Sequence, residues 1–470
     1  EKNQIFKITS NSKLTMQTII TDTENTSVVE EPQLAVKFYP KINTIEKQQK
    51  GTSTLNMLSL FSGCGGMDLG FEGDFSVLKS SVNEILNPDF IDKELDNNFI
   101  KLKRTRFKTV FANDILKDAR NAWVNYFSKR GHNVEDYQTD SIVDLVKLHQ
   151  NGIKVFPENI DIVTGGFPCQ DFSIAGKRNG FDSHKNHRGE LNSETCATEE
   201  TRGKLYMWMK QVIEITQPNI FIAENVKGLV NLSNVKDIIQ SDFSTAGDNG
   251  YLVLNPRVLH AADYGVPQSR ERVFFIGIKK SALKKSALEE LEKESIPDKY
   301  NPYPKPTHAY TTNGKNLKRH VDLKELFTNL KEPESTTDLS QKFYSKAKFM
   351  GKHCQGQIEI KPDGISPTIR AEHHGNIEFR RLSKKNGGIL TEELSKGLKE
   401  RRLTPRECAL IQTFPPDYEF VIENKQGRKG PYLVSPSKAY KIIGNAVPPL
   451  LAYNLAKRLE GVWDLYFKKQ

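Results

Sequence analysis

One segment of the chain combines a nucleophile with residue types that expose it: Gly165-Gly166-Phe167-Pro168-Cys169-Gln170. A thiolate is a strong, soft nucleophile that suits addition to an electron-poor ring carbon. A lone cysteine is more often a buried structural residue. Here, however, the flanking glycines, the polar Gln170 and the restricted backbone of Pro168 argue against a packed core. We therefore interpret Cys169 as a candidate nucleophile.

A carboxyl group and two guanidinium groups are candidates to act beside this thiol. Glu224 follows an apolar run and could pass a proton to a substrate, although a structural acid is the ordinary interpretation of one glutamate. Gln268, Arg270 and Arg272 are spaced by two, so an extended chain would place all three side chains on one face. Two neighbouring guanidinium groups suit the anchoring of a base carbonyl or a phosphate, and a solvated charged edge is the alternative.

A glycine-rich turn follows the first apolar run of the chain. The sequence Phe61-Ser62-Gly63-Cys64-Gly65-Gly66 supplies free backbone amides and allows a ligand to approach closely, but a plain tight turn explains the same pattern equally well. Asp114 ends a later run, where a carboxylate can accept hydrogen bonds from both hydroxyls of a ribose. Taken alone, Asp114 would be interpreted as a solvated acid at the end of a strand.

The sequence signals no metal site. The histidines and cysteines that lie close together lack the four ligands and the spacing of a zinc site. They are His184, His187 and Cys196 in one segment and His373 and His374 in another. We expect these histidines to be loop residues or phosphate contacts. The five cysteines include no Cys-x-x-Cys pair, which fits a reducing cytoplasm where a single thiol stays free.

The elements that must position these residues follow from the apolar runs. Short β-rich runs alternate with helix-length segments, which indicates an α/β domain with a largely parallel sheet. Ligands of such sheets bind beyond the carboxyl ends of the strands, where the glycine turn and Cys169 both fall. We expect strands at 54–61, 108–112, 160–164, 219–223, 251–254 and 272–278, and helices at 205–215, 235–243, 279–293 and 450–459.

Composition divides the chain into four parts. Residues 1–53 are rich in Thr, Asn, Lys and Glu and are expected to form a mobile or accessory N-terminal arm. Residues 54–280 form the sheet domain, 281–434 a smaller second domain, and 435–470 a segment that completes the first. The net charge of +10 and the pI of about 9.0 favour a polyanionic partner. Because neither a membrane helix nor a secretion signal is evident, we expect a cytoplasmic, nucleoid-associated protein.

Taken in order, these segments resemble the DNA (cytosine-5) methyltransferase family, of the bacterial restriction-modification type. The motifs that carry the resemblance span about residues 54–460: FSGCGGMDLGF (61–71), GGFPCQDFSIAG (165–176), RGKLY (202–206), ENV (224–226), QSRERVFFIGI (268–278), RRLTPRECALIQTFP (401–415) and GNAVPP (444–449). The resemblance implies a Rossmann-like sheet that binds S-adenosyl-L-methionine, with a smaller DNA-recognition domain. It also implies methylation of carbon-5 of cytosine in a specific double-stranded DNA sequence, by base flipping and a covalent Cys169–cytosine intermediate.

The resemblance assigns roles to individual residues. Cys169 would be the nucleophile, Glu224 the group at cytosine N3, and Arg270 and Arg272 the anchors of the base and its phosphate. The cofactor would contact Phe61, Gly63, Gly65, Asp114, Asp140, Pro168, Asn445 and Val447, and DNA would contact Gln170, Arg202, Gln268, Thr368, Ile369 and Arg370. Asp114 stands where the family commonly has Glu, and the surroundings of Asp140 match poorly. The implied partners are double-stranded DNA and a cognate restriction endonuclease, with the protein itself a monomer.

Two stretches, 72–107 and 182–201, are longer than the family usually shows. The second falls in the loop that normally closes over DNA, so Arg188 is a rival of Arg202 as the arginine of that loop. We expect specificity in about residues 281–400, because the flanking motifs contact only the flipped base and the methyl donor.

Two other functions are alternatives. An RNA (tRNA) cytosine-5 methyltransferase is disfavoured by the long variable region between QSRER and RRLTPRE, and no second catalytic cysteine is evident in a neighbouring motif. A catalytically silent DNA-binding regulator would need no nucleophile, so the retention of Cys169, Glu224 and both arginines argues against it.

Overall fold

The computed structural model describes residues 6–8, 14–16, 53–168, 205–231, 235–312, 316–354, 356–371, 377–425 and 430–468. The chain forms two compact units, Glu1–Gln49 and Lys50–Gln470. In the first unit, strand β1 (Phe6–Ile8) pairs antiparallel with strand β2 (Leu14–Met16). The second unit contains the central sheet and all the motifs described above.

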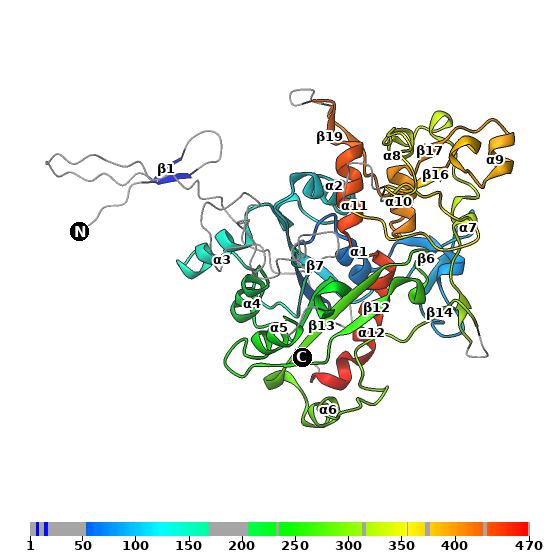
Figure 1. The fold of residues 1–470 in the computed structure, drawn as a ribbon. Helices are drawn as coiled ribbons and strands as arrows, with labels where there is room; N and C mark the ends of the chain where they lie inside the picture. The colour runs from blue at the N-terminus through cyan, green and yellow to red at the C-terminus, as the bar shows by residue number, and fades with distance from the viewer. Residues whose placement is uncertain are drawn as a thin grey trace. The chain divides into compact units, whose positions relative to one another are not determined.

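A mixed eight-stranded sheet forms the centre of the second unit (Figure 1). Its strand order is β11-β13-β10-β9-β3-β7-β8, and β12 pairs with β13 beside this path. The strands are β3 (Leu55–Leu60), β7 (Phe107–Asn113), β8 (Tyr137–Gln138), β9 (Ile162–Gly165), β10 (Ile220–Val226), β11 (Tyr251–Val253), β12 (Arg257–His260) and β13 (Glu271–Lys279). Strands β8, β7, β3, β9 and β10 are parallel, and β13 is antiparallel to its neighbours. The expected α/β class with a largely parallel sheet is confirmed, and the apolar runs located every strand except β8 and β12.

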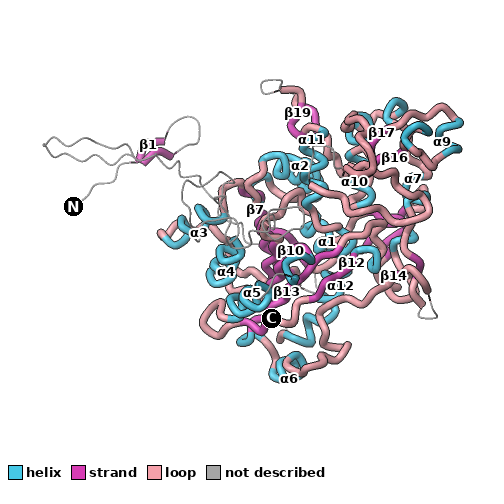
Figure 2. The backbone as a smooth tube through the Cα atoms, viewed as in Figure 1, coloured by secondary structure: helices cyan, strands magenta, loops and turns pink. Residues whose placement is uncertain are grey.

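Helices gather on both sides of this sheet (Figure 2). On one side, α3 (Ile142–Gln150) contacts α4 (Leu205–Thr216), which contacts α5 (Val235–Ser244). On the other, α1 (Gly66–Glu72) packs along α12 (Pro449–Tyr466), and α2 (Lys117–Phe127) contacts α11 (Pro436–Asn445). The C-terminal helices α11 and α12 thereby pack against α2 and α1, which follow the strands β7 and β3.

The long stretch between the first two strands folds as a small sheet of its own. Strands β4 (Ser76–Leu78), β6 (Phe99–Leu102) and β5 (Ile91–Glu94) pair antiparallel in that order. Asn83, between them, donates from its side-chain amide to the carbonyl oxygen of Thr307 at 2.9 Å. The Nζ of Lys318 donates to the carbonyl oxygen of Val82 at 2.7 Å. This insertion is therefore bound to the segment that follows residue 300.

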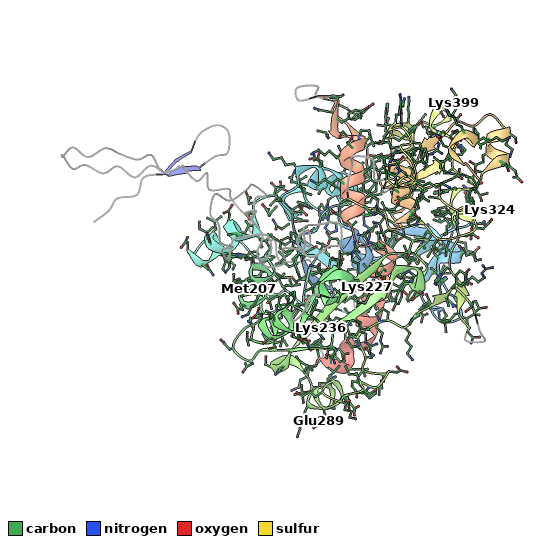
Figure 3. The ribbon with its side chains drawn as sticks, viewed as in Figure 1. Met207, Lys227, Lys236, Glu289, Lys324 and Lys399 are labelled. Atoms are coloured by element: carbon green, nitrogen blue, oxygen red, sulfur yellow. The ribbon has the colours of Figure 1, made fainter. Side chains whose placement is uncertain are left out.

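Residues 281–434 contain short elements, which explains why the sequence there shows no clear alternation. They are α6 (Lys285–Leu291), β14 (His308–Ala309), β15 (Lys318–Arg319), α7 (Leu323–Phe327), α8 (Leu339–Lys342), β16 (Phe379–Arg381), α9 (Thr391–Ser395), β17 (Arg401–Arg402), α10 (Pro405–Ile411), β18 (Ile422–Glu423) and β19 (Tyr432–Val434). The helix expected over 279–293 is confined to α6, because β13 continues to Lys279, where it pairs with Tyr251 of β11. Exposed lysines such as Lys324 and Lys399 project from this region (Figure 3).

Buried ion pairs hold the short elements of this region together. Glu332 accepts hydrogen bonds from the guanidinium groups of both Arg381 and Arg401, and Arg401 also forms two hydrogen bonds of 2.8 Å with Glu407. Arg381 is 1% exposed and Arg402 is also buried. Because breaking a buried ion pair leaves an uncompensated charge, this network fixes the relative positions of β16, β17 and α10.

Candidate active site and cofactor-binding turn

The register of the sheet places three candidate residues and Gly166 in one row. Leu60 of β3 lies opposite both Asn113 of β7 and Gly165 of β9, and Gly165 lies opposite Ala223 of β10. The residues one step further along these strands are Phe61, Asp114, Gly166 and Glu224. Between β3 and β9 the strand order also reverses direction, which is the point where open α/β sheets bind their ligands.

The glycine turn after β3 is held by hydrogen bonds on several sides. The Gly63 N–H donates to Oδ2 of Asp114 at 3.1 Å, and the Gly63 carbonyl accepts from the hydroxyl of Tyr137 at 2.7 Å. The hydroxyl of Tyr418 donates to the carbonyl of Cys64 at 2.6 Å. Phe61 has a φ of 52°, a left-handed conformation that non-glycine residues adopt rarely and that clusters at functional sites. The turn is thus fixed before any ligand binds.

The two glycines proposed to contact the cofactor lie in different surroundings. A Cβ atom on Gly63 would meet no atom of the described residues within 4 Å, whereas a Cβ on Gly65 would lie 2.6 Å from the Trp123 ring. Both have positive φ, 55° and 76°. Gly63 therefore leaves open space for a ligand, while Gly65 allows the turn to pack against the aromatic side chains of α2.

Asp114 joins the glycine turn to the start of α2. Besides Gly63, its carboxylate accepts a hydrogen bond from the Leu116 N–H at 2.9 Å. Burial raises the pKa of Asp114, although its two backbone donors act in the opposite direction. Each carboxylate oxygen accepts one of these bonds and retains a lone pair, so ribose hydroxyls can still donate to it. Asp140 lies close by, because the Asn113 amide donates to the Asp140 carbonyl at 2.8 Å.

The GNAVPP turn closes against the same region. A Cβ on Gly66 would lie 2.3 Å from the Val447 carbonyl oxygen, so the two backbones are in direct contact. Val447 is buried and Asn445, at the end of α11, is exposed. The structure therefore brings Val447 to the first turn of α1.

Glu224 lies against the loop that leads to Cys169. Its Oε1 is 2.8 Å from Nε of Arg272. A Cβ on Gly166 would lie 2.7 Å from its Oε2. Glu224 is buried, and burial raises the pKa of its carboxyl group, although Arg272 and Arg270 counteract that effect. The pKa of the carboxyl is thus shifted in favour of its protonated form, and the carboxyl is held next to the loop that leads to Cys169.

Asn225 fixes the same loop from the other side. Its side-chain amide donates to the carbonyl oxygen of Phe167 at 3.2 Å, and both residues are buried. Pro168, the last described residue of the loop, is half-buried. Cys169, Gln170 and Arg202 lie outside the described residues, as do His184, His187, Cys196, His373 and His374.

Two other cysteines are poor nucleophiles. Cys64 and Cys408 are fully buried, and burial raises the pKa of both thiols far above the usual range. A thiol that does not ionise is inert as a nucleophile. Cys64, although it lies within the glycine turn, instead donates to the carbonyl oxygen of Ile442 at 3.3 Å.

Gln268 and Arg270 have other partners than the sequence suggested. Both are fully buried. Arg270 donates to the carbonyl oxygens of Ile369 and Gly444, at 2.9 Å each. Gln268 accepts from the Ile369 N–H at 2.8 Å and donates to Oε1 of Gln412 at 2.9 Å. Buried polar groups require such partners. Both side chains therefore hydrogen-bond to other segments of the protein and are not accessible to solvent.

Residues 368–370, which were expected to read DNA, belong to the segment that Gln268 and Arg270 bind. Ile369 is fully buried, which differs from the expected DNA contact. The Thr368 hydroxyl donates to the carbonyl oxygen of Ser269, whose N–H donates to the Ser366 carbonyl at 2.8 Å. Arg370 is half-buried, and one of its terminal nitrogens is buried without a hydrogen-bond partner among the described residues. Arg272, in the same motif as Gln268 and Arg270, contacts Glu224 instead.

Sequence reasoning missed four residues that support the site: Tyr137, Asn225, Gln412 and Tyr418. Asn225 stands inside the ENV motif and could have been found there. The aromatic residues carried no signal, because their hydroxyls reach backbone 74 and 354 residues away in the chain. Gln412 lies 144 residues from its partner Gln268.

A glycine turn and a buried carboxyl group with a raised pKa, at the switch point of a mostly parallel sheet, fit an α/β methyltransferase. Residues 55–461 match the family model described as C-5 cytosine-specific DNA methylase. The chain belongs to this family: it is a DNA cytosine-5 methyltransferase that uses S-adenosylmethionine.

Curated relatives agree with this assignment, and a solved structure agrees in fold. The chain is 31% identical over 435 residues to the Type II methyltransferase M.BsuRI of Bacillus subtilis, covering 91% of this chain and 84% of the relative. It is 31% identical over 442 residues to M.BspRI of Lysinibacillus sphaericus, covering 92% and 87%. The solved Entamoeba histolytica methyltransferase EhMeth matches in fold, with a TM-score of 0.52 at 14% identity over 88% of this chain and 99% of that one. Among the helices of the described residues, none is long and apolar enough to cross a membrane.

Proposed function

We propose that this enzyme methylates cytosine within one specific double-stranded DNA sequence, with Cys169 as the nucleophile and Glu224 as the group that holds the proton at N3. The observation that supports this most directly is the position of Glu224. Its carboxyl is buried, has a raised pKa and touches Gly166, three residues before Cys169. A buried acid poised to donate a proton beside a candidate nucleophile is an arrangement that catalysis requires and that stability does not.

The reaction begins with a base that has been swung out of the helix, because carbon-6 of a stacked cytosine is inaccessible. The Cys169 thiolate adds to carbon-6, and the proton held by Glu224 neutralises the charge that develops on N3. The ring then reacts at carbon-5, which gains a methyl group while keeping its original proton. Removal of that proton by a base expels the Cys169 thiolate, and the proton on N3 returns to Glu224, which restores the neutral aromatic ring.

S-adenosylmethionine supplies an activated methyl group through its sulfonium charge. The residues that fit it are those of the preorganised turn: the open face of Gly63, the remaining lone pairs of Asp114 and the backbone of Val447 that closes against α1. A turn that is rigid before binding loses little entropy when it aligns the reactants, and alignment can contribute roughly 7–11 kcal/mol.

Arg272 has a positioning role in this proposal. Its Nε holds Oε1 of Glu224 at 2.8 Å, which leaves Oε2 free to face the base. Arg270 instead secures the segment 366–370 against the GNAVPP turn, through Ile369 and Gly444. The sequence predicted that both arginines would anchor the base and its phosphate. In this proposal Arg272 positions Glu224, whereas Arg270 binds backbone.

Recognition of the DNA sequence is proposed to lie in residues 281–434. This region is basic and shows exposed lysines, which suit phosphate contacts, and its loops provide side chains for the major groove. Since the relatives are named Type II methyltransferases, we also propose that a restriction endonuclease acts on the same site. We further propose that the enzyme acts as a monomer in the cytoplasm, at the nucleoid.

Transfer of tritiated methyl groups to DNA and to tRNA, followed by bisulfite sequencing of the DNA product, tests the proposal. The expected result is 5-methylcytosine at one position of one short sequence in duplex DNA, and no transfer to tRNA. Transfer to tRNA alone, or at cytosines without a shared sequence context, would contradict it.

A further inference from the structure

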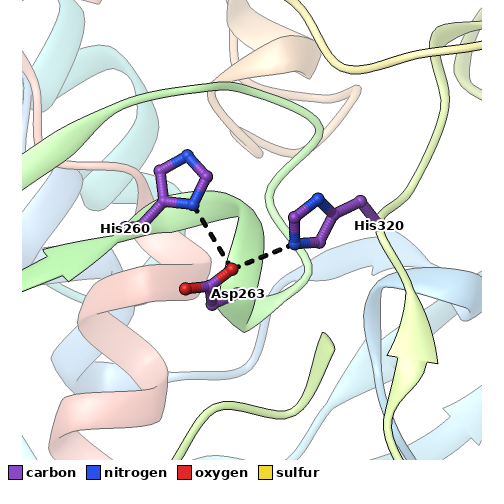
Figure 4. A group of neighbouring side chains, drawn as sticks. All are labelled: His260, Asp263 and His320. Atoms are coloured by element: carbon purple, nitrogen blue, oxygen red, sulfur yellow. Dashed lines mark hydrogen bonds and ion pairs between the residues drawn. The ribbon is translucent and has the colours of Figure 1, made fainter. Parts of the chain in front are cut away.

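Three metal-ligating side chains meet at a point that the reaction does not use: His260, Asp263 and His320 (Figure 4). His260 ends β12, and Asp263 lies in the short helical turn that follows it. His320 directly follows β15, far along the chain in the region expected to recognise DNA. No sequence motif indicates this cluster, because His320 lies 57 residues from Asp263.

The geometry of the cluster is close to that of a metal site. Oδ1 of Asp263 is 3.3 Å from Nδ1 of His260 and 3.0 Å from Nε2 of His320. All three candidate ligand atoms lie within 4.8 Å of one another. In a tetrahedral zinc site with bonds of about 2.0–2.2 Å, neighbouring ligand atoms are about 3.3 Å apart. Small side-chain rotations therefore suffice to bring the three atoms around one ion.

The donor set selects the class of ion. Two imidazole nitrogens and one carboxylate oxygen suit borderline transition metals such as Zn²⁺ and Co²⁺, whereas Mg²⁺ and Ca²⁺ prefer oxygen ligands alone. The three side chains are only partly exposed, at 28%, 34% and 12% for His260, Asp263 and His320. An ion can therefore reach the cluster from solvent, and a water molecule can supply the fourth ligand.

Outer contacts orient these ligands, as they do in established metal sites. The free ring nitrogen of His260, Nε2, lies 3.4 Å from the hydroxyl of Ser269. The backbone carbonyl of Asp263 accepts from the Thr307 N–H at 2.8 Å. His308, the other histidine nearby, is turned away, with its Nε2 2.9 Å from the Ser80 carbonyl oxygen.

We propose that His260, Asp263 and His320 bind one divalent transition-metal ion of the zinc type. The ion links the edge of the catalytic sheet, at β12, to the segment 307–320, which also carries the contacts to the 72–107 insertion. Ser269 orients one ligand and also binds the Thr368 hydroxyl through its carbonyl oxygen. The ion therefore stiffens the joint between the catalytic sheet and the segment that precedes the recognition loops.

Cobalt is the probe for this site, because its visible absorption reports coordination geometry. The full-length protein is treated with chelator, dialysed and titrated with Co²⁺ alone, and Zn²⁺ is then added as a competitor. The expected result is one equivalent of Co²⁺ bound at micromolar concentration, with d–d absorption and no thiolate charge-transfer band, displaced by Zn²⁺. Asp263→Asn and His320→Ala abolish this spectrum, and Ser269→Ala weakens binding about 10-fold or more.

His353→Ala is the matched control, because His353 is exposed and stands outside the cluster, and this variant keeps the spectrum. Circular dichroism shows whether the Asp263 and His320 variants are folded, and the spectrum of the wild-type protein decides the proposal if they are not. Absence of d–d absorption in the wild-type protein would overturn it. So would a thiolate charge-transfer band, or a spectrum that folded Asp263→Asn and His320→Ala proteins retain.

Discussion

Gly166 and Glu224 approach each other so closely that a Cβ atom on Gly166 would lie 2.7 Å from Oε2 of Glu224. The contact follows from the parallel pairing of β9 with β10, in which Gly165 lies opposite Ala223. Gly166 therefore has a role that its backbone angles do not reveal, since its φ is not in the left-handed region. The missing side chain leaves room for the Glu224 carboxyl beside the loop that leads to Cys169.

Gly166→Ala tests this relationship directly. The added methyl group must displace either the carboxyl of Glu224 or the loop, and misplacement of a catalytic group by about 1 Å can cost about 100-fold in rate. We expect a loss of about that size in single-turnover methyl transfer, with cofactor affinity unchanged. Gly461→Ala is the control, because a Cβ there meets nothing within 4 Å. Equal rates for the two variants would show that the contact has no catalytic consequence.

Glu224→Gln tests the acid itself. Glutamine preserves the size of the side chain and can still meet Arg272, but it cannot transfer a proton to N3. We expect DNA binding in gel-shift assays to be retained while single-turnover methyl transfer falls by about 10²–10⁴-fold. An unchanged rate would remove Glu224 from the mechanism.

Cys169→Ala tests the nucleophile. DNA with 5-fluorocytosine at the target position should trap the wild-type enzyme covalently in the presence of cofactor, because fluorine cannot leave as a proton and the elimination stalls. The variant should form no adduct that survives denaturing electrophoresis. Cys408→Ala and Cys354→Ala should form it normally, since Cys408 is fully buried with a raised pKa and Cys354 is not part of any motif. An adduct with Cys169→Ala protein would assign the chemistry to another residue.

Much of this site was predictable because its determinants are local. The strands are continuous apolar runs, and parallel strands bring the residues at their carboxyl ends together, so Phe61, Asp114 and Glu224 were placed at one edge from sequence alone. The loop of Gly166 follows from the same rule. The exclusion of Cys64 as a nucleophile needed the structure, because only packing shows that its thiol is buried.

The missed features depend on contacts between distant segments. Arg270 sits two residues from Arg272 in sequence, yet its partners are backbone carbonyls 99 and 174 residues away. Alternation along an extended chain predicts a shared face, but it cannot tell whether that face meets DNA or another segment of protein. Ile369 is buried by the same contacts, and its burial could not be predicted from the sequence for the same reason.

The titration of His132 predicts how the free energy of unfolding depends on pH. Burial lowers its pKa, but the interactions with Asp136 and Glu72 outweigh burial and raise it from 6.5 to about 9. Below pH 6.5, protonated His132 contributes its full stabilisation of the folded state. This contribution to the free energy of unfolding is lost as the pH rises through about 9. The shift corresponds to about 3 kcal/mol in the free energy of unfolding.

Urea unfolding of His132→Gln and wild-type protein between pH 6 and 9.5 measures this contribution. The difference between the two free energies of unfolding should be largest near pH 6 and should shrink as pH rises. His353→Gln, at an exposed position, should show no such trend. A difference between wild type and His132→Gln that is constant with pH would show that His132 acts by packing alone.

Exchange of the recognition region between two enzymes tests where DNA specificity lies. The contacts that Gln268 and Arg270 make with residues 366–370 decide where the exchanged segments must begin and end. Residues 366–370 are bound by Gln268 and Arg270, so replacing them would disturb the joint with the catalytic sheet as well as the DNA contacts. Residues 281–365 and 371–400 should therefore come from a relative of different specificity, with 366–370 kept. Glu332 and Arg381, which form an ion pair at 2.8 Å, would then both come from the same donor protein.

We expect bisulfite sequencing of DNA methylated by this chimera to show methylation at the donor's sequence, because neighbouring base pairs must be read by side chains outside the cytosine pocket. Point substitutions then separate the two kinds of contact: loss of a base-reading residue costs roughly 1–3 kcal/mol on the cognate site and relaxes one position, whereas loss of a phosphate contact weakens all sequences alike and lowers the salt dependence. A chimera that is active but still methylates the original sequence would place specificity outside residues 281–400.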